Sequence, residues 1–123
     1  MELYKIETIE REGGKALFKI IYNDNNSIFK GHFPSKPVVP GVMLMQTVKE
    51  CFEQLEGILT VIESADLKFM NPVLPGDENR VFLEIKYMEN ENEYKVKSSG
   101  FSEEKKFSKI NIVVRGIVKW KSS

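Results

Sequence analysis

The chain has 123 residues, and its 18 basic and 18 acidic side chains give a formal net charge of zero. This length predicts one domain over residues 1–123, and the balanced charge excludes the basic surface with which most nucleic-acid-binding proteins hold phosphates. No apolar run approaches the ~20 residues that span a bilayer, so no membrane partner is expected. Because the N-terminus lacks a signal-peptide core and Cys51 is the single cysteine, we expect a cytoplasmic protein without disulfides.

The first half of the chain predicts a hairpin, a loop and one helix. Residues 3–11 and 15–22 are rich in β-forming apolar residues and flank a Gly-Gly turn. Turn-forming residues follow at 24–27, and then a proline-rich loop leads to a helical pattern over 41–56. Apolar side chains recur there at steps of three and four, at Val42, Met45, Val48, Phe52 and Leu55.

The second half predicts four strands. Gly57 is a plausible helix stop, and residues 58–70 form one long strand interrupted near 63–64. Further strands are expected at 80–89, 93–101 and 106–120. One helix with six strands predicts an α+β domain in which a curved antiparallel sheet covers the helix. A single chain would leave sheet edges and part of the helix uncovered, so we expect a homodimer.

The loop before the helix holds His32, the only histidine of the chain, followed by three prolines within eight positions. A lone histidine is more often a structural residue that hydrogen-bonds to the backbone. Imidazole nevertheless titrates near neutral pH, and the helix start at Gly41 offers free N–H groups nearby. A rigid loop that leads into a helix N-terminus is a workable start for acid–base chemistry on a carbonyl compound.

Two motifs resemble the β-hydroxyacyl-(acyl carrier protein) dehydratase family of the hotdog fold. The first is GHFPSKPVVPGV at residues 31–42, and the second is ADLKFMNPVLPGD at residues 65–77. The resemblance implies a hotdog fold with one long central helix wrapped by a curved antiparallel six-stranded sheet. Two positions differ from the family pattern. Ser35 stands where glycine is usual, and Gln46 stands where the family has its catalytic carboxylate.

The resemblance also implies the roles of the site residues. His32 is the base that removes the C2 proton of a 3-hydroxyacyl thioester, and the Val38 carbonyl accepts from its other ring nitrogen. The Gly41 N–H stabilises the enolate-like oxygen. Substrate contacts are expected from Phe33, Pro34, Val38, Val42 and Phe69. No cofactor is implied, and one histidine with one cysteine makes a metal site improbable on donor chemistry.

Gln46 decides how far the resemblance extends to activity. An amide has no titratable proton to give to a leaving hydroxyl. It can be a buried residue that satisfies local backbone groups, or it can bind the substrate hydroxyl or a water. Glu50 lies one helical turn further on and is a poor substitute acid, because the rise per residue places it about 6 Å along the helix. Several apolar residues (Met43, Leu44, Met45, Phe69 and Met70) can line an acyl tunnel, but core packing is the commoner use of such residues.

Three functions remain open at this point. The first is a 3-hydroxyacyl thioester dehydratase of fatty-acid or related acyl-chain metabolism, acting on an acyl carrier protein or coenzyme A thioester. The second is a hotdog thioesterase in which Gln46 positions water and His32 assists hydrolysis. The third is a non-catalytic acyl-binding subunit, or half of a heterodimer whose carboxylate-bearing partner completes a site with His32. We expect the dehydratase, with Gln46 in place of its carboxylate.

Overall fold

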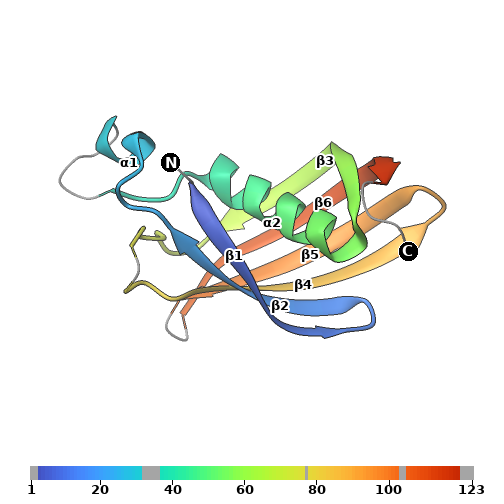
Figure 1. Cartoon of the computed structure of the whole chain (residues 1–123), viewed down its shortest axis with the longest axis horizontal. Coiled ribbons are helices and arrows are strands. Elements are labelled where there is room, and N and C mark those ends of the chain that lie inside the picture. Colours follow the sequence, from blue (N-terminus) through green and yellow to red (C-terminus); the bar gives the residue numbers. More distant parts are fainter. Residues whose placement is uncertain (1–2, 32–36, 77, 103–104, 120–123) are drawn as a thin grey trace.

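The computed structural model of the chain describes residues 3–31, 37–76, 78–102 and 105–119. One antiparallel six-stranded sheet has the strand order β1-β2-β4-β5-β6-β3. The sheet curves around the long helix α2 (Gly41–Glu56), which lies against its concave face (Figure 1). The strands are β1 (Tyr4–Glu12), β2 (Lys15–Tyr22), β3 (Ile58–Phe69), β4 (Val81–Asn90), β5 (Glu93–Ser102) and β6 (Lys105–Lys119). The predicted α+β architecture and element order are thereby confirmed.

The β1–β2 hairpin forms where the sequence predicts it. Gly13 occupies the turn with φ of 55°, a left-handed conformation that glycine adopts without a steric penalty. Alternate side chains of β2 point into the core and are fully or almost fully buried, at Ala16, Phe18, Ile20 and Tyr22. Burial along β2 therefore alternates with the same period of two residues as the apolar side chains in the sequence.

Helix α2 has the predicted bounds and buries one face. It follows Pro40, whose backbone is extended (φ −61°, ψ 148°), and no side chain caps its N-terminus. It ends at Gly57, which has φ of 66° and donates its N–H to the Glu53 carbonyl at 2.8 Å. This is the left-handed C-terminal cap that the glycine predicts. The buried residues are Met43, Leu44, Thr47, Val48, Cys51, Phe52, Glu53 and Leu55.

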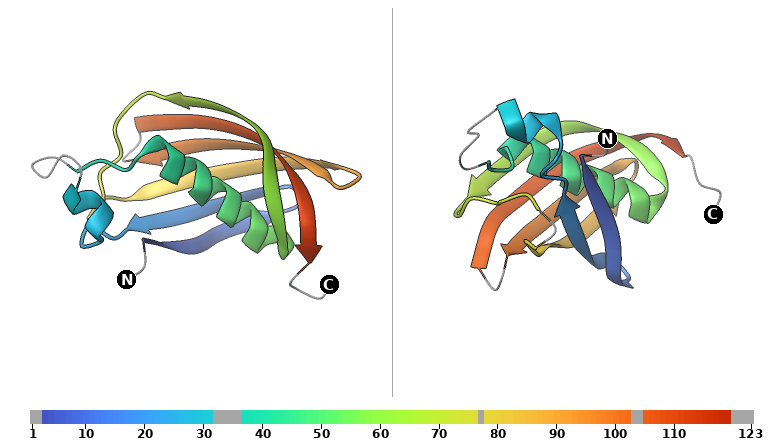
Figure 2. Two further views of the ribbon diagram at one scale, coloured as in Figure 1. Left: turned by 90° about the horizontal axis from the view of Figure 1, so that it is seen from above. Right: turned by 60° about the vertical axis from the view of Figure 1, so that its left-hand side comes forward.

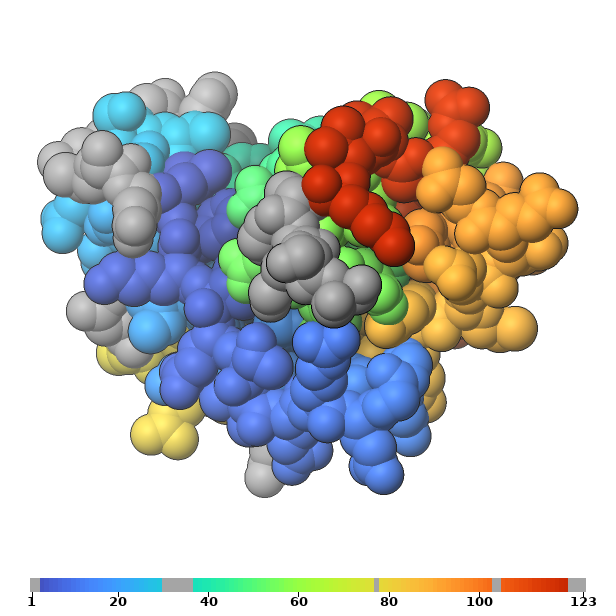
Figure 3. Space-filling model, turned by 45° about the vertical axis from the view of Figure 1, so that its right-hand side comes forward, coloured from blue at the N-terminus to red at the C-terminus, as the bar shows by residue number. Residues whose placement is uncertain are grey.

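β3 is one long edge strand that pairs with β6 alone. Its register shifts between Ile62 and Ser64, at the interruption that the sequence predicts. From Glu63 to Phe69 its side chains are exposed or half-buried, because no second strand covers this edge. The helix α2 is exposed at residues 42, 46 and 54, so one chain does not enclose it. Figure 3 shows green surface between β1 (blue) and the end of β6 (red). In the described residues, no helix is long and apolar enough to cross a membrane.

One element was not predicted. A short helix, α1 (Ser27–Gly31), follows the turn at 24–27 and lies at the end of the molecule where α2 begins (Figure 2). Asn26 initiates it, since its side-chain oxygen accepts from the Ile28 N–H at 3.1 Å. Phe29 is 3% exposed and anchors the turn in the core. Turn-forming residues such as Asn26 can end a strand or cap the start of a helix. Burial of Phe29 favours the helix here.

Candidate functional site

An open pocket of about 390 Å³ lies at the N-terminal end of α2. One wall is formed by residues 38–41 with Leu44, and the other by residues 69–73. The two walls are tied together by a hydrogen bond of 2.7 Å from the Val39 N–H to the Val73 carbonyl. Most lining side chains are apolar, which suits an acyl chain or another apolar group.

The second wall is fixed to the sheet just beyond the end of β3. The Met70 N–H donates to the Phe107 carbonyl at 2.8 Å, and the Asn71 amide nitrogen donates to the Lys106 carbonyl at 2.7 Å. Both acceptors belong to β6. The pocket is therefore shaped by the sheet, not by a free loop.

Gly41 places a backbone N–H donor beside this pocket. The N–H groups of Met43 and Leu44 both donate to the Pro40 carbonyl, at 3.0 and 3.2 Å. Among the described residues, no hydrogen-bond acceptor is found for the Gly41 N–H. A Cβ atom on Gly41 would lie 2.7 Å from Cζ of the Phe69 ring. Glycine thus lets the Phe69 ring lie directly over the start of the helix, where N–H groups and the helix dipole favour negative charge.

The structure brings three of the predicted site residues together. Val38, Gly41 and Phe69 all line the pocket, although Phe69 lies 31 positions after Val38 in the sequence. Phe69 keeps 45% of its surface exposed and therefore contributes to the pocket rather than to the core. The predicted base His32 and the predicted contacts Phe33 and Pro34 lie outside the described residues.

Val42 and Gln46 lie on the solvent-exposed side of α2 and do not line the pocket. Val42 is 69% exposed. The Gln46 side-chain nitrogen donates to a carboxylate oxygen of Glu50 at 3.2 Å. The interpretation of Gln46 as a buried amide that satisfies backbone groups is therefore wrong, and Glu50 is its direct neighbour.

A buried polar cluster behind these two residues was missed at the level of sequence. Thr47 donates to the Met43 carbonyl at 2.7 Å, so its hydroxyl oxygen accepts from the Tyr22 hydroxyl, also at 2.7 Å. The Tyr4 ring packs edge-on against Tyr22, with centroids 5.5 Å apart. Burial, followed by the neighbouring Glu50 carboxylate, raises the pKa of Tyr4 well above its usual value. Only Thr47, a polar residue within the apolar stripe, could have signalled this cluster.

The ApeI-like family model, described as ApeI dehydratase, matches residues 8–111, which is most of the chain. The chain belongs to the ApeI-like dehydratase family. The 3-hydroxyacyl-[acyl-carrier-protein] dehydratase FabZ of Geobacter metallireducens is 37% identical over 71 residues, or 46% of this chain and 45% of the relative. Such alignments span about half the length of the curated relatives that the chain matches.

Solved structures place this ApeI-like chain in the hotdog fold. The dehydratase heterocomplex ApeI:P from Xenorhabdus doucetiae contains a chain that superposes with a TM-score of 0.71 at 24% identity, over 90% of this chain and 98% of that one. A Streptococcus mutans protein bound to acetyl CoA superposes with a TM-score of 0.71 at 10% identity, over 95% and 92% of the two chains. At these identities the likeness establishes the fold, and the predicted hotdog fold is confirmed.

Other chemistry-bearing groups of the ApeI-like chain are occupied in packing. Cys51 is fully buried, and burial raises the pKa of its thiol far above the usual value, so it is not a nucleophile at neutral pH. Met43 and Leu44 are core residues, as expected, although Leu44 also touches the pocket. Met70 is 40% exposed and lines the pocket instead. The described residues contain no group of three side chains placed to hold a metal.

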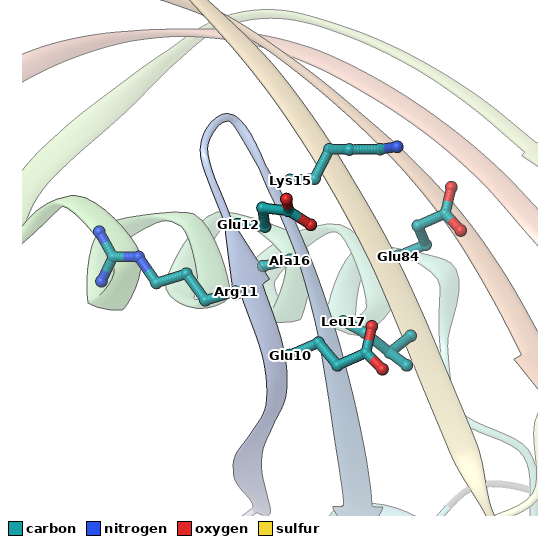
Figure 4. Close-up of a pocket in the computed structure, with 7 residues that line it drawn as sticks. All are labelled: Glu10, Arg11, Glu12, Lys15, Ala16, Leu17 and Glu84. Atoms are coloured by element: carbon teal, nitrogen blue, oxygen red, sulfur yellow. The ribbon is translucent and has the colours of Figure 1, made fainter.

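A second hollow, of about 190 Å³, lies on the β1–β2 hairpin beside β4. It carries charges of both signs, from Glu10, Arg11, Glu12, Lys15 and Glu84. Arg11 points away from the carboxylates, and the side chains do not converge on one point (Figure 4). This hairpin tip lies at the opposite end of the molecule from the start of α2 (Figure 1). It is a solvated charged surface, and the apolar pocket at Gly41 is the better candidate site.

Proposed function

We propose that this ApeI-like chain is a 3-hydroxyacyl thioester dehydratase subunit that handles acyl groups at the start of α2. The observation that carries this proposal is the apolar pocket that ends at the Gly41 N–H, which has no acceptor among the described residues, in a chain of the dehydratase family. Loss of the C2 proton moves charge onto the thioester oxygen. A backbone donor at a helix N-terminus stabilises that charge where it develops.

The proposed base is His32, which precedes the pocket residues 38–41 in the sequence. The imidazole removes the C2 proton, and the electron pair moves into the thioester carbonyl as the enolate forms. The Val38 carbonyl holds the tautomer by accepting from the other ring nitrogen. Phe33, Pro34, Val42 and Phe69 contact the acyl chain or the carrier arm. Hydroxide then leaves from C3 and needs a proton, which Gln46 does not supply.

The acid is proposed to come from a second chain. The ApeI:P heterocomplex of Xenorhabdus doucetiae supports such pairing for this family. A partner with a carboxylate at the position of Gln46 would complete one site together with His32. A homodimer of this chain alone would bind 3-hydroxyacyl thioesters and dehydrate them slowly. An acyl carrier protein or coenzyme A is the proposed carrier, with fatty-acid or related acyl-chain metabolism as the setting.

Exposed surfaces on α2 and β3 support a dimer of either kind. β3 is an unpaired edge, and Leu59, Val61 and Phe69 on it are each more than one-third exposed. Exposed apolar strand edges tend to pair with another chain. We propose that two chains join at β3 into a continuous sheet and together enclose their helices. Light scattering at micromolar concentration should give twice the chain mass, and a monomeric mass would contradict the proposal.

A thioesterase is the second candidate, because the exposed Gln46 amide can orient a water. The acetyl CoA carried by the Streptococcus mutans structure supports acyl-CoA binding on this fold. In this alternative Gln46 positions the water that attacks the thioester carbon, and His32 takes its proton. The reaction then yields a free thiol and an acid.

Product analysis tests the proposal directly. Purified protein is incubated with short and medium 3-hydroxyacyl thioesters of coenzyme A and of acyl carrier protein. An enoyl thioester seen by mass spectrometry supports the dehydratase, whereas free thiol supports the thioesterase. Because Cys51 is buried, the protein itself adds little background to a thiol assay. Saturable binding without either product supports a non-catalytic subunit, and a carboxylate-bearing partner is then added to the same assay.

A further inference from the structure

The hydrogen bond between Gln46 and Glu50 determines which way the Gln46 amide faces. The two side chains are one turn apart on the exposed side of α2, and the amide nitrogen lies 3.2 Å from the Glu50 oxygen. An ionised carboxylate can only accept hydrogen bonds, so the amide must turn its nitrogen towards it. The amide oxygen of Gln46 is then directed away from Glu50 and remains an acceptor.

Glu50 is well placed to keep this arrangement. Among the described residues, no cation pairs with Glu50, because its neighbour Lys49 pairs with Glu53 at 3.1 Å instead. Tyr4 lies beside Glu50 on the side of β1 and is held by its packing against the buried Tyr22. The Tyr4 hydroxyl is buried without a hydrogen bond of good geometry to a described residue and faces the same carboxylate, so it can donate to Glu50 alongside the Gln46 amide.

We propose that Glu50 is a positioning residue of the site shared between two chains, where it holds the Gln46 amide oxygen outward to accept a hydrogen bond from the C3 hydroxyl of the substrate. The proposal rests on the proposed function, in which this chain binds 3-hydroxyacyl thioesters. A carboxylic acid at the position of Gln46 donates a proton to that hydroxyl, whereas the amide oxygen accepts the proton that the hydroxyl offers.

The consequence is a selectivity for the oxidation state of C3. A hydroxyl at C3 is a donor and satisfies the Gln46 oxygen. A C3 carbonyl is an acceptor and faces the same oxygen with a lone pair, while a C3 methylene leaves the oxygen without a partner. The site therefore prefers 3-hydroxyacyl groups over saturated acyl groups, and saturated acyl groups over 3-oxoacyl groups.

The test compares affinities for three matched ligands. The probes are coenzyme A analogues with an amide in place of the thioester, carrying a 3-hydroxyacyl, a saturated or a 3-oxoacyl chain of equal length. Calorimetry on the intact protein should show a preference of about two- to tenfold for the 3-hydroxyacyl analogue over the saturated one. Glu50→Gln should remove this preference, because an amide at position 50 accepts or donates equally well and no longer fixes Gln46. Glu56→Gln removes the same charge from the other end of α2 and should keep the preference.

A double-mutant cycle separates positioning from general structure. If Glu50 acts through Gln46, then Gln46→Leu alone removes the preference and Glu50→Gln adds no further loss to it. Additive losses would overturn the proposal, as would an unchanged preference in Glu50→Gln. If the wild-type protein binds all three analogues equally, this inference fails while the proposed function stands. If it binds none of them, the proposed function fails and the inference fails with it.

A spectroscopic readout does not depend on ligand. The Gln46 side-chain amide signals in a ¹⁵N-correlated spectrum should shift in Glu50→Gln and stay in place in Glu56→Gln. Backbone amide signals of α2 that remain in place show that the helix is intact. Gln46 signals that do not move in Glu50→Gln would show that the contact is absent in solution, and would overturn the proposal.

Discussion

The two ends of α2 differ in how their polar groups are satisfied. At the C-terminal end, Gly57 caps the helix, and the buried carboxylate of Glu53 accepts from the Thr60 N–H at 2.7 Å and from the Lys49 ammonium at 3.1 Å. The N-terminal end has no side-chain cap, and its first N–H groups lie beside an open pocket.

The two ends of α2 also differ in how their side chains are packed. Near the C-terminal end, the Phe52 ring contacts Tyr87 and Tyr94, with centroids 5.0 and 4.9 Å apart. Burial raises the pKa of both tyrosines to about 12, so both remain protonated at neutral pH. At the other end, Val42 and Phe69 are exposed. One end of the helix stabilises the fold, and the other keeps donors and apolar surface available for a ligand.

The largest expected effect at the N-terminal end comes from Gln46→Glu. The new side chain is nearly isosteric and lies one turn from Glu50, and two carboxylates at this spacing raise the pKa of one of them. A carboxyl that is protonated near neutral pH can serve as the missing acid, which predicts a gain in dehydration rate of about 10²–10⁴. The rate of enoyl thioester formation is measured under single-turnover conditions, because slow product release does not then limit the measured rate. A fast wild-type enzyme that is slowed by this change would favour the thioesterase.

Removal of the proposed base should abolish activity and leave stability intact. His32→Ala is expected to lower the turnover rate by at least ~10²-fold, because general-base catalysis is lost. Thermal unfolding should shift little, since the sequence predicts a loop at His32 and loop substitutions usually cost little stability. The rate is measured in the assay that shows turnover, with the partner chain present if one is required. An undiminished rate in a folded variant would remove His32 from the mechanism.

The opposite pattern is expected at the C-terminal end. Glu53→Ala leaves the buried Thr60 N–H without its acceptor and breaks the pair with Lys49. We expect a loss of about 2–3 kcal/mol in the free energy of unfolding, with unchanged ligand affinity in the folded fraction. Urea denaturation measures the loss. Glu56→Ala is the matched control, because it removes a carboxylate from the same turn without a bond to a buried N–H.

A pair of glycine substitutions gives the smallest and most direct comparison. Gly41→Ala pushes the exposed Phe69 ring off the helix start, so ligand affinity should fall several-fold, which is of the order of one hydrogen bond, with little change in stability. Gly57→Ala places a side chain at a φ of 66° and should cost about 1 kcal/mol of stability without affecting ligand binding. Calorimetry of both variants measures the effect on ligand binding, and thermal unfolding measures the effect on stability. A stability loss confined to Gly41→Ala would reverse the roles of the two ends.

Much of the fold was predictable because its signals are local. Burial alternates along β2 as its apolar residues do, and α2 begins and ends where a proline and a glycine stand in the sequence. Even the irregularity of β3 near residues 63–64 was visible, as a break in its apolar run. The short helix α1 was missed, because its formation depends on burial of Phe29 against residues far away in the chain.

The candidate site was predictable only in part. The motif at residues 31–42 identified the family and drew attention to Val38, Gly41 and Gln46. It did not show that Gln46 is exposed or that Glu50 holds its amide, since that contact depends on the rotamers of both side chains. The 6 Å separation expected from the sequence reflects backbone rise alone, whereas long side chains one turn apart can meet.

By itself, the sequence determined the order and kind of the elements, the hotdog family and the residues to examine. These properties follow from periodicity, turn chemistry and a motif, all of which are local in the chain. Only the tertiary structure decided that residues 38–41 and 69–73 form one pocket, that Phe69 covers Gly41, and that Glu53 caps the start of β3. Such contacts arise when the sheet wraps the helix and brings distant segments within hydrogen-bonding or van der Waals distance, which no local pattern encodes.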